Sequence, residues 1–309
     1  MNAGKLFAII APIFAMIGMG QLAVRFRFVD KAGLRGLNDL VFFAGLPALL
    51  FRSVVEAPTF SVLAIASAYF TAGLVVYGVA FAFSLFAFRM GLARAAMIGL
   101  NASYGNTVLM GVPVVAGVYG QDGLSSLLGI ISLQSVVFLP MTTVLIEIGG
   151  KRQTNLRNLL RITVFGVIRN PIILSIFSAL LWRAAGIPVP DALDGWLNML
   201  GAAGPPVALF CLGASLPLVK MGGVALEALF CSLLKLIAMP LLVWTVARAA
   251  GLSGLPLAVA IMTGALPTGA NAFMIARRAE TGLEASAATV VLATAVFPVT
   301  LALVLAATR

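Results

Sequence analysis

The sequence contains no histidine, only two cysteines and no GxxxxGK(S/T) nucleotide-binding motif. The absence of histidine excludes zinc-hydrolase sites and histidine-based acid–base catalysis. Cys211 and Cys231 both lie inside apolar runs, so we expect packing residues and not a disulfide framework. Without the nucleotide-binding motif, energy from ATP would have to come from another subunit.

Charge is also scarce, since 10% of the 309 residues are charged and 61% are hydrophobic. A soluble domain carries about 25% charged residues. Most of this chain therefore avoids water. The net charge of +10 could suggest nucleic acid, but in a membrane protein we interpret it as loop charge that sets orientation.

Ten apolar stretches are long enough to cross a membrane, which takes about 20 helical residues. The first carries only Lys5 at its start and no clear A-x-A cleavage site follows it, so we interpret it as a span and not a signal peptide. The sequence thus predicts an all-α polytopic membrane protein. The predicted spans are residues 5–24, 34–54, 62–88, 95–119, 124–147, 164–185, 196–218, 226–249, 256–276 and 285–307.

Lysine and arginine are distributed unevenly between the two sides of these spans. Fourteen follow the odd-numbered spans and five lie on the opposite side, while Lys235 lies inside the eighth span. The positive-inside rule then places both termini outside. It also makes the basic linker 151–163 cytoplasmic, where we expect it to anchor the topology near anionic lipid.

The two halves of the chain share a weak internal repeat. Residues 1–150 align with residues 160–309 at a nearly constant offset of 158 to 164 through five successive spans. Because five is odd, the second copy must enter the membrane from the opposite face. This predicts two inverted five-helix repeats, 1–150 and 164–309, a recurrent plan of secondary transporters. Matched residues include Pro12 and Pro171, Asn38 and Asn198, Arg89 and Arg248, Gly105 and Gly269, and Pro140 and Pro298.

Helix-breaking residues interrupt the fourth and ninth spans at equivalent positions. These residues are Gly105, Pro113, Pro267 and Gly269. Proline removes a backbone donor, and unwound backbone at membrane depth is tolerated only when it is buried in protein or lines a wet cavity. Paired breaks of this kind indicate a transporter binding site.

The breaks also supply binding groups. A half-helix that begins at mid-membrane exposes free N–H groups and the positive end of its dipole, so it can bind an anion without a basic side chain. The alternative is that the polar side chains nearby only cap freed backbone groups, or, for Gln134, bond another helix. The candidate substrate ligands are Ser103, Tyr104, Asn106, Thr107, Gln134, Thr268 and Asn271.

One charged residue lies near the centre of a span. A charge there is costly and is a functional hypothesis by default, so Lys235 is a candidate charge partner of the substrate, although it could instead snorkel or organise neighbouring carbonyls. No acidic residue lies at mid-membrane. A carboxylate relay for protons or sodium is therefore not evident, and sodium held by carbonyl, Asn and Thr oxygens stays open.

Four motifs resemble those of the auxin efflux carrier family, which includes plant auxin exporters and bacterial permeases assigned to malonate or malate. The motifs are residues 37–51, residues 103–107 with 110–113, residues 169–171 and residues 265–271, and the similarity covers essentially the whole chain. The resemblance implies ten helices in the manner of bile-acid sodium symporters and of NhaA, with helices 4 and 9 crossing at their breaks.

The resemblance also implies roles for the helices. Helices 1, 2, 6 and 7 would form a scaffold and the surface of a homodimer, and helices 3–5 and 8–10 would form a mobile transport domain. Asn106, Pro113 and Pro267 match the crossover, and Gln134 matches a polar position that lines the site. The short linker after the fifth span differs from plant members, and together with the composition it suggests a bacterial inner-membrane protein.

We therefore expect a secondary transporter of small organic anions, such as malonate, malate or auxin-like acids, that works by elevator-type or rocking alternating access. No cofactor or nucleic acid is expected. An inside-negative voltage drives a monoanion outward by roughly 2.3 kcal/mol per 100 mV, so export can run uncoupled, whereas uptake needs co-transported cations. The alternatives are a sodium-coupled bile-acid-type symporter and a non-transporting receptor on the same fold. A membrane enzyme is disfavoured because no metal cluster or nucleophile–base pair falls within a span.

Overall fold

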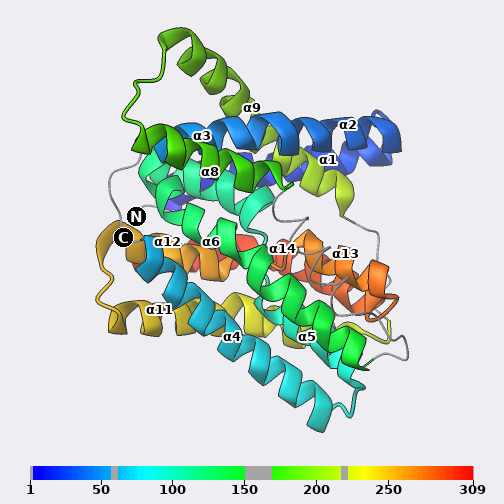
Figure 1. Ribbon diagram of the computed structural model, residues 1–309. Coiled ribbons are helices and arrows are strands. Elements are labelled where there is room, and N and C mark those ends of the chain that lie inside the picture. Colours follow the sequence, from blue (N-terminus) through cyan, green and yellow to red (C-terminus); the bar gives the residue numbers. More distant parts are fainter. Residues whose placement is uncertain (1–2, 57–61, 150–168, 217–221, 309) are drawn as a thin grey trace. The chain divides into compact units, whose positions relative to one another are not determined.

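The computed structural model describes residues 3–56, 62–149, 169–216 and 222–308, and in these ranges the chain is helical, with one isolated β-bridge and no strand (Figure 1). Three of the elements are π-helical turns, labelled η. The elements are α1 (Ala3–Arg25), α2 (Lys31–Leu40), η1 (Val41–Gly45), α3 (Leu46–Glu56), α4 (Val62–Phe86), α5 (Leu92–Ser103), η2 (Thr107–Gly111), α6 (Val112–Gly149), α8 (Pro171–Ala184), α9 (Asp191–Ser215), α10 (Ala225–Leu233), η3 (Leu234–Ala238), α11 (Met239–Ala249), α12 (Gly254–Ala265), α13 (Ala270–Ala279) and α14 (Leu283–Thr308).

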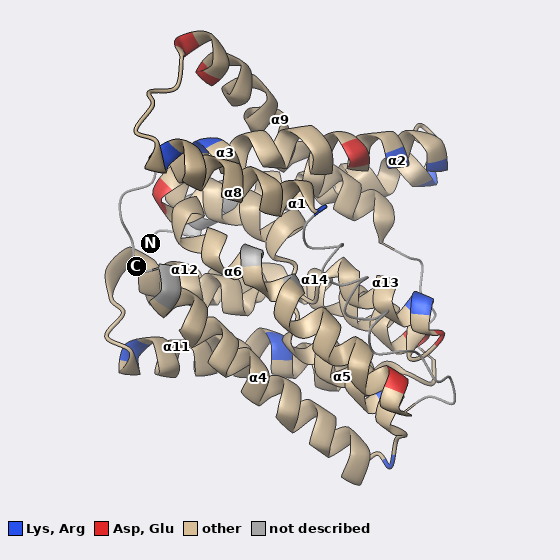
Figure 2. Cartoon of the chain, in the orientation of Figure 1, with Lys and Arg blue, Asp and Glu red and all other residues tan. Residues whose placement is uncertain are grey.

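Within the described ranges, six helical stretches are long and apolar enough to cross a membrane, and three shorter apolar helices accompany them. The six cover Lys31–Glu56, Ala64–Phe86, Thr107–Gly149, Asp191–Ser215, Ala225–Ala249 and Leu283–Thr308. The protein is therefore a multi-pass membrane protein. Figure 2 agrees with this conclusion, because most of the ribbon carries neither acidic nor basic residues.

Among the described residues, the helical stretches that are long and apolar enough to cross a membrane are fewer than the ten predicted spans for identifiable reasons. The fourth and ninth predicted spans are each cut into two shorter pieces, α5 with η2 and α12 with α13. The predicted fourth and fifth spans also run together in α6, across a kink at Gly120 where φ is 64° and ψ is −154°. Glycine adopts this positive φ without a Cβ clash. The basic linker 151–163 and the start of the predicted sixth span lie outside the described residues.

Local sequence signals explain several helix starts. Asp30 precedes α2 and its carboxylate accepts a hydrogen bond from the Gly33 N–H at 2.7 Å. Asn170 precedes α8 and accepts from the Ile172 N–H at 2.9 Å, and Pro171 occupies the first helical position. Both residues are preferred N-caps, and proline at the first position loses no intrahelical bond.

The chain divides into two compact units, each of which takes segments from both halves of the sequence. The first unit consists of Met1–Val62, Val108–Ser132 and Gly166–Leu216. The second unit consists of Leu63–Thr107, Leu133–Phe165 and Pro217–Arg309.

Glycines allow the helices of the first unit to approach closely, as is common between membrane helices. In α1, Gly20 faces the Phe210 carbonyl of α9, and in α9, Gly213 faces the Ile17 carbonyl of α1, each so closely that a Cβ atom would overlap the oxygen. Gly45 of η1 meets Gly204 of α9, where a Cβ atom on Gly45 would lie 2.8 Å from the Gly204 Cα. The absence of side chains at these positions sets the spacing of α1, η1 and α9.

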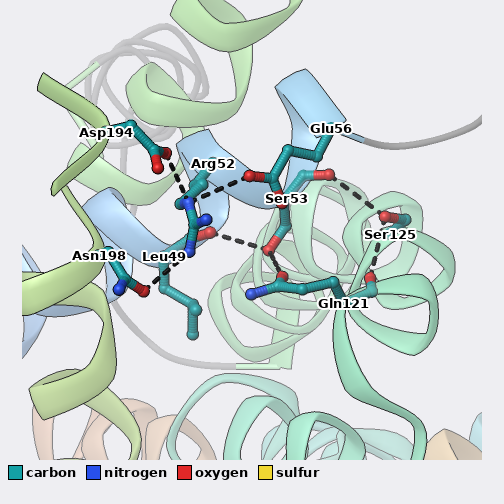
Figure 3. Close-up of polar contacts among 8 residues, drawn as sticks. All are labelled: Leu49, Arg52, Ser53, Glu56, Gln121, Ser125, Asp194 and Asn198. Atoms are coloured by element: carbon teal, nitrogen blue, oxygen red, sulfur yellow. Dashed lines mark hydrogen bonds and ion pairs between the residues drawn. The ribbon is translucent and has the colours of Figure 1, made fainter. Parts of the chain in front are cut away.

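A polar cluster ties α3 to two other elements of the first unit (Figure 3). The Arg52 guanidinium donates to Asp194 Oδ1 at 2.7 Å and to Asn198 Oδ1 at 2.8 Å, both on α9, and its Nε lies 3.1 Å from Glu56 Oε1. The Ser53 hydroxyl lies 2.6 Å from Gln121 Oε1 on α6. The carbonyl of Ser53 accepts from the Ser125 hydroxyl, so this end of α3 is fixed on two sides.

Aromatic residues and small residues form the core of the second unit. Phe138 of α6 contacts the rings of Phe70 and Tyr77 of α4, with centroids 6.0 and 6.4 Å apart. At Gly73 of α4, a Cβ atom would lie 2.7 Å from the Phe138 ring, so glycine makes room for the aromatic group. On the other side, alanines let α10 and α14 pack against each other, around Ala228, Ala285 and Ala288.

An ion pair in the second unit should respond asymmetrically to mutation. Arg94 of α5 binds Glu227 of α10 at 2.5 Å, with side chains 45% and 11% exposed, and the second carboxylate oxygen of Glu227 is buried without a partner among the described residues. Arg94→Met leaves a buried carboxylate unpaired and should lower the free energy of unfolding by about 2–3 kcal/mol. Glu227→Gln leaves only a half-exposed guanidinium unpaired and should lower the free energy of unfolding by less than about 1 kcal/mol. Thermal unfolding of both purified variants measures the difference, and equal losses would contradict this account.

Candidate functional site

The two helix breaks meet inside the second unit. Helix α5 ends at Ser103 and α12 ends at Ala265, and the residues that follow them run antiparallel to each other. The Asn106 N–H donates to the Pro267 carbonyl at 2.8 Å, and the Gly269 N–H donates to the Tyr104 carbonyl at 2.9 Å. Backbone groups that the broken helices leave free thus bond each other.

Glycine is required at this meeting point for space and not for backbone conformation. A Cβ atom on Gly269 would lie 2.8 Å from the Tyr104 ring and 3.0 Å from the Gly105 carbonyl oxygen. A Cβ atom on Gly105 would lie 3.2 Å from the Tyr69 hydroxyl. The break residues that the sequence singled out therefore pack against each other at short range.

Three side chains donate to carbonyl groups around the breaks. Gln134 Nε2 of α6 donates to the Gly105 carbonyl at 2.6 Å, and Thr268 Oγ1 donates to the Asn101 carbonyl at 2.7 Å. Lys235 Nζ of η3 donates to the Gly264 carbonyl at 2.5 Å. The Thr268 contact is of the capping kind, because its one hydroxyl donor bonds a backbone carbonyl, and the Gln134 contact is a bond from α6 to another segment.

The other candidate ligands differ in how they contribute. Asn271 is exposed, and its Nδ2 donates to the Tyr104 hydroxyl at 3.0 Å, which links α13 to the first break. Ser103 Oγ donates to the Gly99 carbonyl of its own helix at 2.8 Å. Thr107 is buried at the start of η2, and Pro113 lies further along in α6, in the first unit.

Asn106 is the candidate whose side chain retains an unused donor. It is 5% exposed, and its Nδ2 atom has no hydrogen-bond partner among the described residues. A buried polar donor without a partner costs about 1–3 kcal/mol, so such a group in a native protein calls for an explanation. The residue lies directly before the helical segment that begins at Thr107.

The charge at this site comes from lysine alone among the described residues. Lys235 is fully buried, and it takes part in none of the ion pairs formed by the described residues. The described residues contain no group of three or more His, Cys, Asp or Glu side chains placed to hold a metal ion.

Sequence reasoning missed two residues that shape the breaks. Asn101 of α5 is fully buried, its Nδ2 donates to Ser286 Oγ of α14 at 2.9 Å and its carbonyl accepts from Thr268. The Tyr69 hydroxyl of α4 donates to Gln134 Oε1 at 3.2 Å and thereby orients the Gln134 amide. Asn101 had a usable signal, as an amide within an apolar helix, whereas nothing local distinguishes Tyr69 from a packing residue.

Replacement of Gln134 by leucine should destabilise the second unit. The change leaves the buried Gly105 carbonyl and the Tyr69 hydroxyl without partners, which together should cost about 2–4 kcal/mol. Tyr69→Phe removes only the weaker of the two bonds and is the matched control, with an expected loss below about 1.5 kcal/mol. Thermal unfolding in detergent tests this ranking, and a Gln134→Leu variant as stable as Tyr69→Phe would contradict it.

Six helical stretches able to cross a membrane and a pair of hydrogen-bonded helix breaks define a polytopic membrane protein with a buried polar centre. The chain belongs to the membrane transport protein family, which matches residues 6–305, and the resemblance to auxin efflux carriers is thereby confirmed.

Several named proteins are similar over much of the chain. The "Putative malonate transporter" of Rhizobium meliloti (strain 1021) is 25% identical over 94% of this chain and 92% of its own length. The "Uncharacterized transporter YfdV" of Escherichia coli (strain K12) is 28% identical over 86% of each chain. The mouse (Mus musculus) "Lysosomal cholesterol signaling protein" is 26% identical over 78% of this chain but only 30% of its own length.

Proposed function

We propose that this protein is a secondary transporter of small organic carboxylates and that the substrate binds at the paired helix breaks of the second unit. The observation that carries the proposal is the buried, unpaired Nδ2 donor of Asn106 beside the start of a helical segment at Thr107. A helix start offers free N–H groups and a positive dipole end, which together with a side-chain amide suit a carboxylate. The name of the rhizobial relative agrees with malonate as a first candidate.

The proposed binding set is smaller than the predicted set. Asn106 and Thr107 would contact the carboxylate, while Lys235 supplies positive charge nearby. Gln134, Thr268 and Asn271 would hold the breaks in place, since each donates one hydrogen bond to a carbonyl or hydroxyl group there. Tyr104 would form a wall through its ring.

Ten spans in two inverted five-helix repeats remain our proposal for the architecture. In such an arrangement, residues near the pseudo-twofold axis meet their own counterparts. Gly45 and Gly204 contact each other, and their numbers differ by 159, one less than the offset of 160 that aligns Asn38 with Asn198 in the same spans, so each lies next to the counterpart of the other. The antiparallel bridge between Gly105 and Thr268 supports the same symmetry at the breaks.

The proposed mechanism is elevator-type alternating access, with predicted helices 3–5 and 8–10 as the moving part and helices 1, 2, 6 and 7 as the scaffold. It is supported by the fact that both breaks, Gln134 and Lys235 all belong to the second unit. The proposal includes a homodimer formed through the scaffold helices, both termini outside, and location in the bacterial inner membrane. The charge asymmetry of the loops supports this orientation.

Transport of labelled malonate, malate and indole-3-acetate into proteoliposomes tests the proposal. Purified protein should move at least one of them above protein-free vesicles under some combination of imposed voltage, pH and sodium gradients. Binding without flux would favour a receptor on the same fold, and a strict need for sodium would favour a bile-acid-type symporter. If none of the three binds or moves, the organic-anion proposal is wrong.

A further inference from the structure

Lys235 occupies an unusual position for a membrane lysine. Its side chain is fully buried and cannot reach water at a membrane surface. Its Nζ atom donates to the Gly264 carbonyl in the last turn of α12, directly before the second break. A Cβ atom on Gly105 would lie 3.4 Å from Lys235 Cε and 3.5 Å from Nζ, so the ammonium group also lies against the first break.

Lys235 lies in a stretch of helix whose backbone departs from regular α-helical bonding. Lys235 lies in the π-helical turn η3, where the Met239 N–H bonds the Leu234 carbonyl five residues earlier. Pro240 follows directly. Proline inside a helix clashes with the carbonyl four residues before it and removes one bond, and a wider π-helical turn accommodates both effects.

The surroundings of the Lys235 amine are those of a cation site. The last turns of α5 and α12 both end at the breaks, and helix C-termini expose carbonyl groups and the negative end of the helix dipole. Carbonyl oxygens at broken membrane helices are typical ligands of sodium in secondary transporters. Here the Gly264 carbonyl is already bonded by an amine that belongs to the protein.

We propose that the Lys235 ammonium is a tethered cation that takes the place of a coupling sodium ion at the paired breaks. It stabilises the C-terminal ends of the half-helices, so carboxylate binding and transport do not require sodium. It also offsets one negative charge of the bound carboxylate. This inference rests on the proposed transport of carboxylates.

One consequence concerns a substrate with a single charge, such as indole-3-acetate. Exchange of one such monoanion for another moves only the loaded site, in which the Lys235 charge offsets that of the anion. Net transport also requires the empty site, which carries the lysine charge, to return. Exchange of this monoanion should therefore respond less to an imposed membrane voltage than its net flux does.

The first test uses the unmodified protein in proteoliposomes. Counterflow of labelled malonate, or of whichever of malate and indole-3-acetate is transported, is measured in sodium chloride and in choline chloride at equal ionic strength. The two rates should agree within about twofold. A rate at least tenfold higher in sodium would overturn the tethered-cation inference and leave the transporter proposal standing, whereas no flux of any of the three anions would overturn the transporter proposal itself.

Substitutions of Lys235 provide an independent test. Lys235→Ala opens space beside the Gly264 carbonyl, so carboxylate binding should fall at least tenfold in choline and recover in sodium. Lys235→Met fills the space without charge and should not recover, while the Lys31→Ala control in α2 should bind like the unmodified protein. Binding is read as the thermal shift caused by malonate. Sodium-independent binding by a folded Lys235→Ala variant would overturn the inference. If both Lys235 variants fail to fold, the comparison of counterflow in sodium chloride and in choline chloride still decides it.

Discussion

Replacement of Asn106 by alanine should weaken carboxylate binding by roughly 10- to 150-fold while leaving the protein at least as stable as before. The loss corresponds to one hydrogen bond to a charged group, about 1.5–3 kcal/mol. We expect no loss of stability because the Nδ2 atom has no partner among the described residues. Deleting such a buried donor removes its desolvation cost and breaks no hydrogen bond of that atom. Malonate titration followed by thermal shift, and counterflow in proteoliposomes, measure the two quantities on one preparation.

Asn101 provides the matched control for this experiment. It is also a buried asparagine, but its Nδ2 already donates to Ser286. Asn101→Ala should therefore lower the unfolding temperature and change binding by less than Asn106→Ala does. If Asn106→Ala binds and transports malonate normally, the unpaired donor is not a substrate ligand and the site proposed at the breaks is wrong.

The second large effect should appear at α1, where Gly20→Ala should prevent normal packing of α1 on α9. The added Cβ atom would overlap the Phe210 carbonyl oxygen and lie 2.9 Å from the Ala214 nitrogen. Both atoms belong to the backbone, so they cannot move unless the whole helix shifts. Overpacking typically costs about 1–3 kcal/mol and occasionally more, and a clash with backbone should lie at the upper end.

Gly18 lies two residues away on the same helix and has open space around its Cβ position. Gly18→Ala should therefore be neutral or stabilising by up to about 1 kcal/mol, the gain in helix propensity. The comparison removes propensity as an explanation, because both changes are glycine to alanine in α1. Thermal unfolding and the fraction of monodisperse protein after extraction measure it, and equal stability of the two variants would show that α1 and α9 do not pack in this way.

Periodicity and composition were enough to predict an all-helical membrane protein, because a long apolar segment must satisfy its backbone internally. They could not give the lengths of continuous helices. Gly120 carries a kink within α6, and a glycine in an apolar stretch looks the same whether it bends a helix or ends one. Helix packing could not be predicted either. Gly18 and Gly20 look alike in the sequence, but a Cβ atom would have open space at Gly18 and would overlap the Phe210 carbonyl at Gly20.

The location of the polar centre could also be anticipated, because Gly105, Pro267 and Gly269 mark positions where helices cannot continue. The roles of individual side chains could not, because they depend on partners far away in sequence. Gln134 looked equally suited to a ligand and to an interhelical bond until its contact with the Gly105 carbonyl was located. The Asn106 Nδ2 atom has no hydrogen-bond partner among the described residues, whereas the Thr268 hydroxyl donates to the Asn101 carbonyl.

The contact between Gly45 and Gly204 bears on how such a chain could arise. If the two halves descend from one duplicated five-helix gene, these glycines descend from neighbouring codons, because they differ by 159 where Asn38 and Asn198 differ by 160. Before the duplication, two copies of the short protein inserted in opposite directions would have met at this same turn, where there was little room for side chains. Fusion later allowed the two halves to diverge, but at this point of contact neither half could gain a Cβ atom without displacing the backbone of the other.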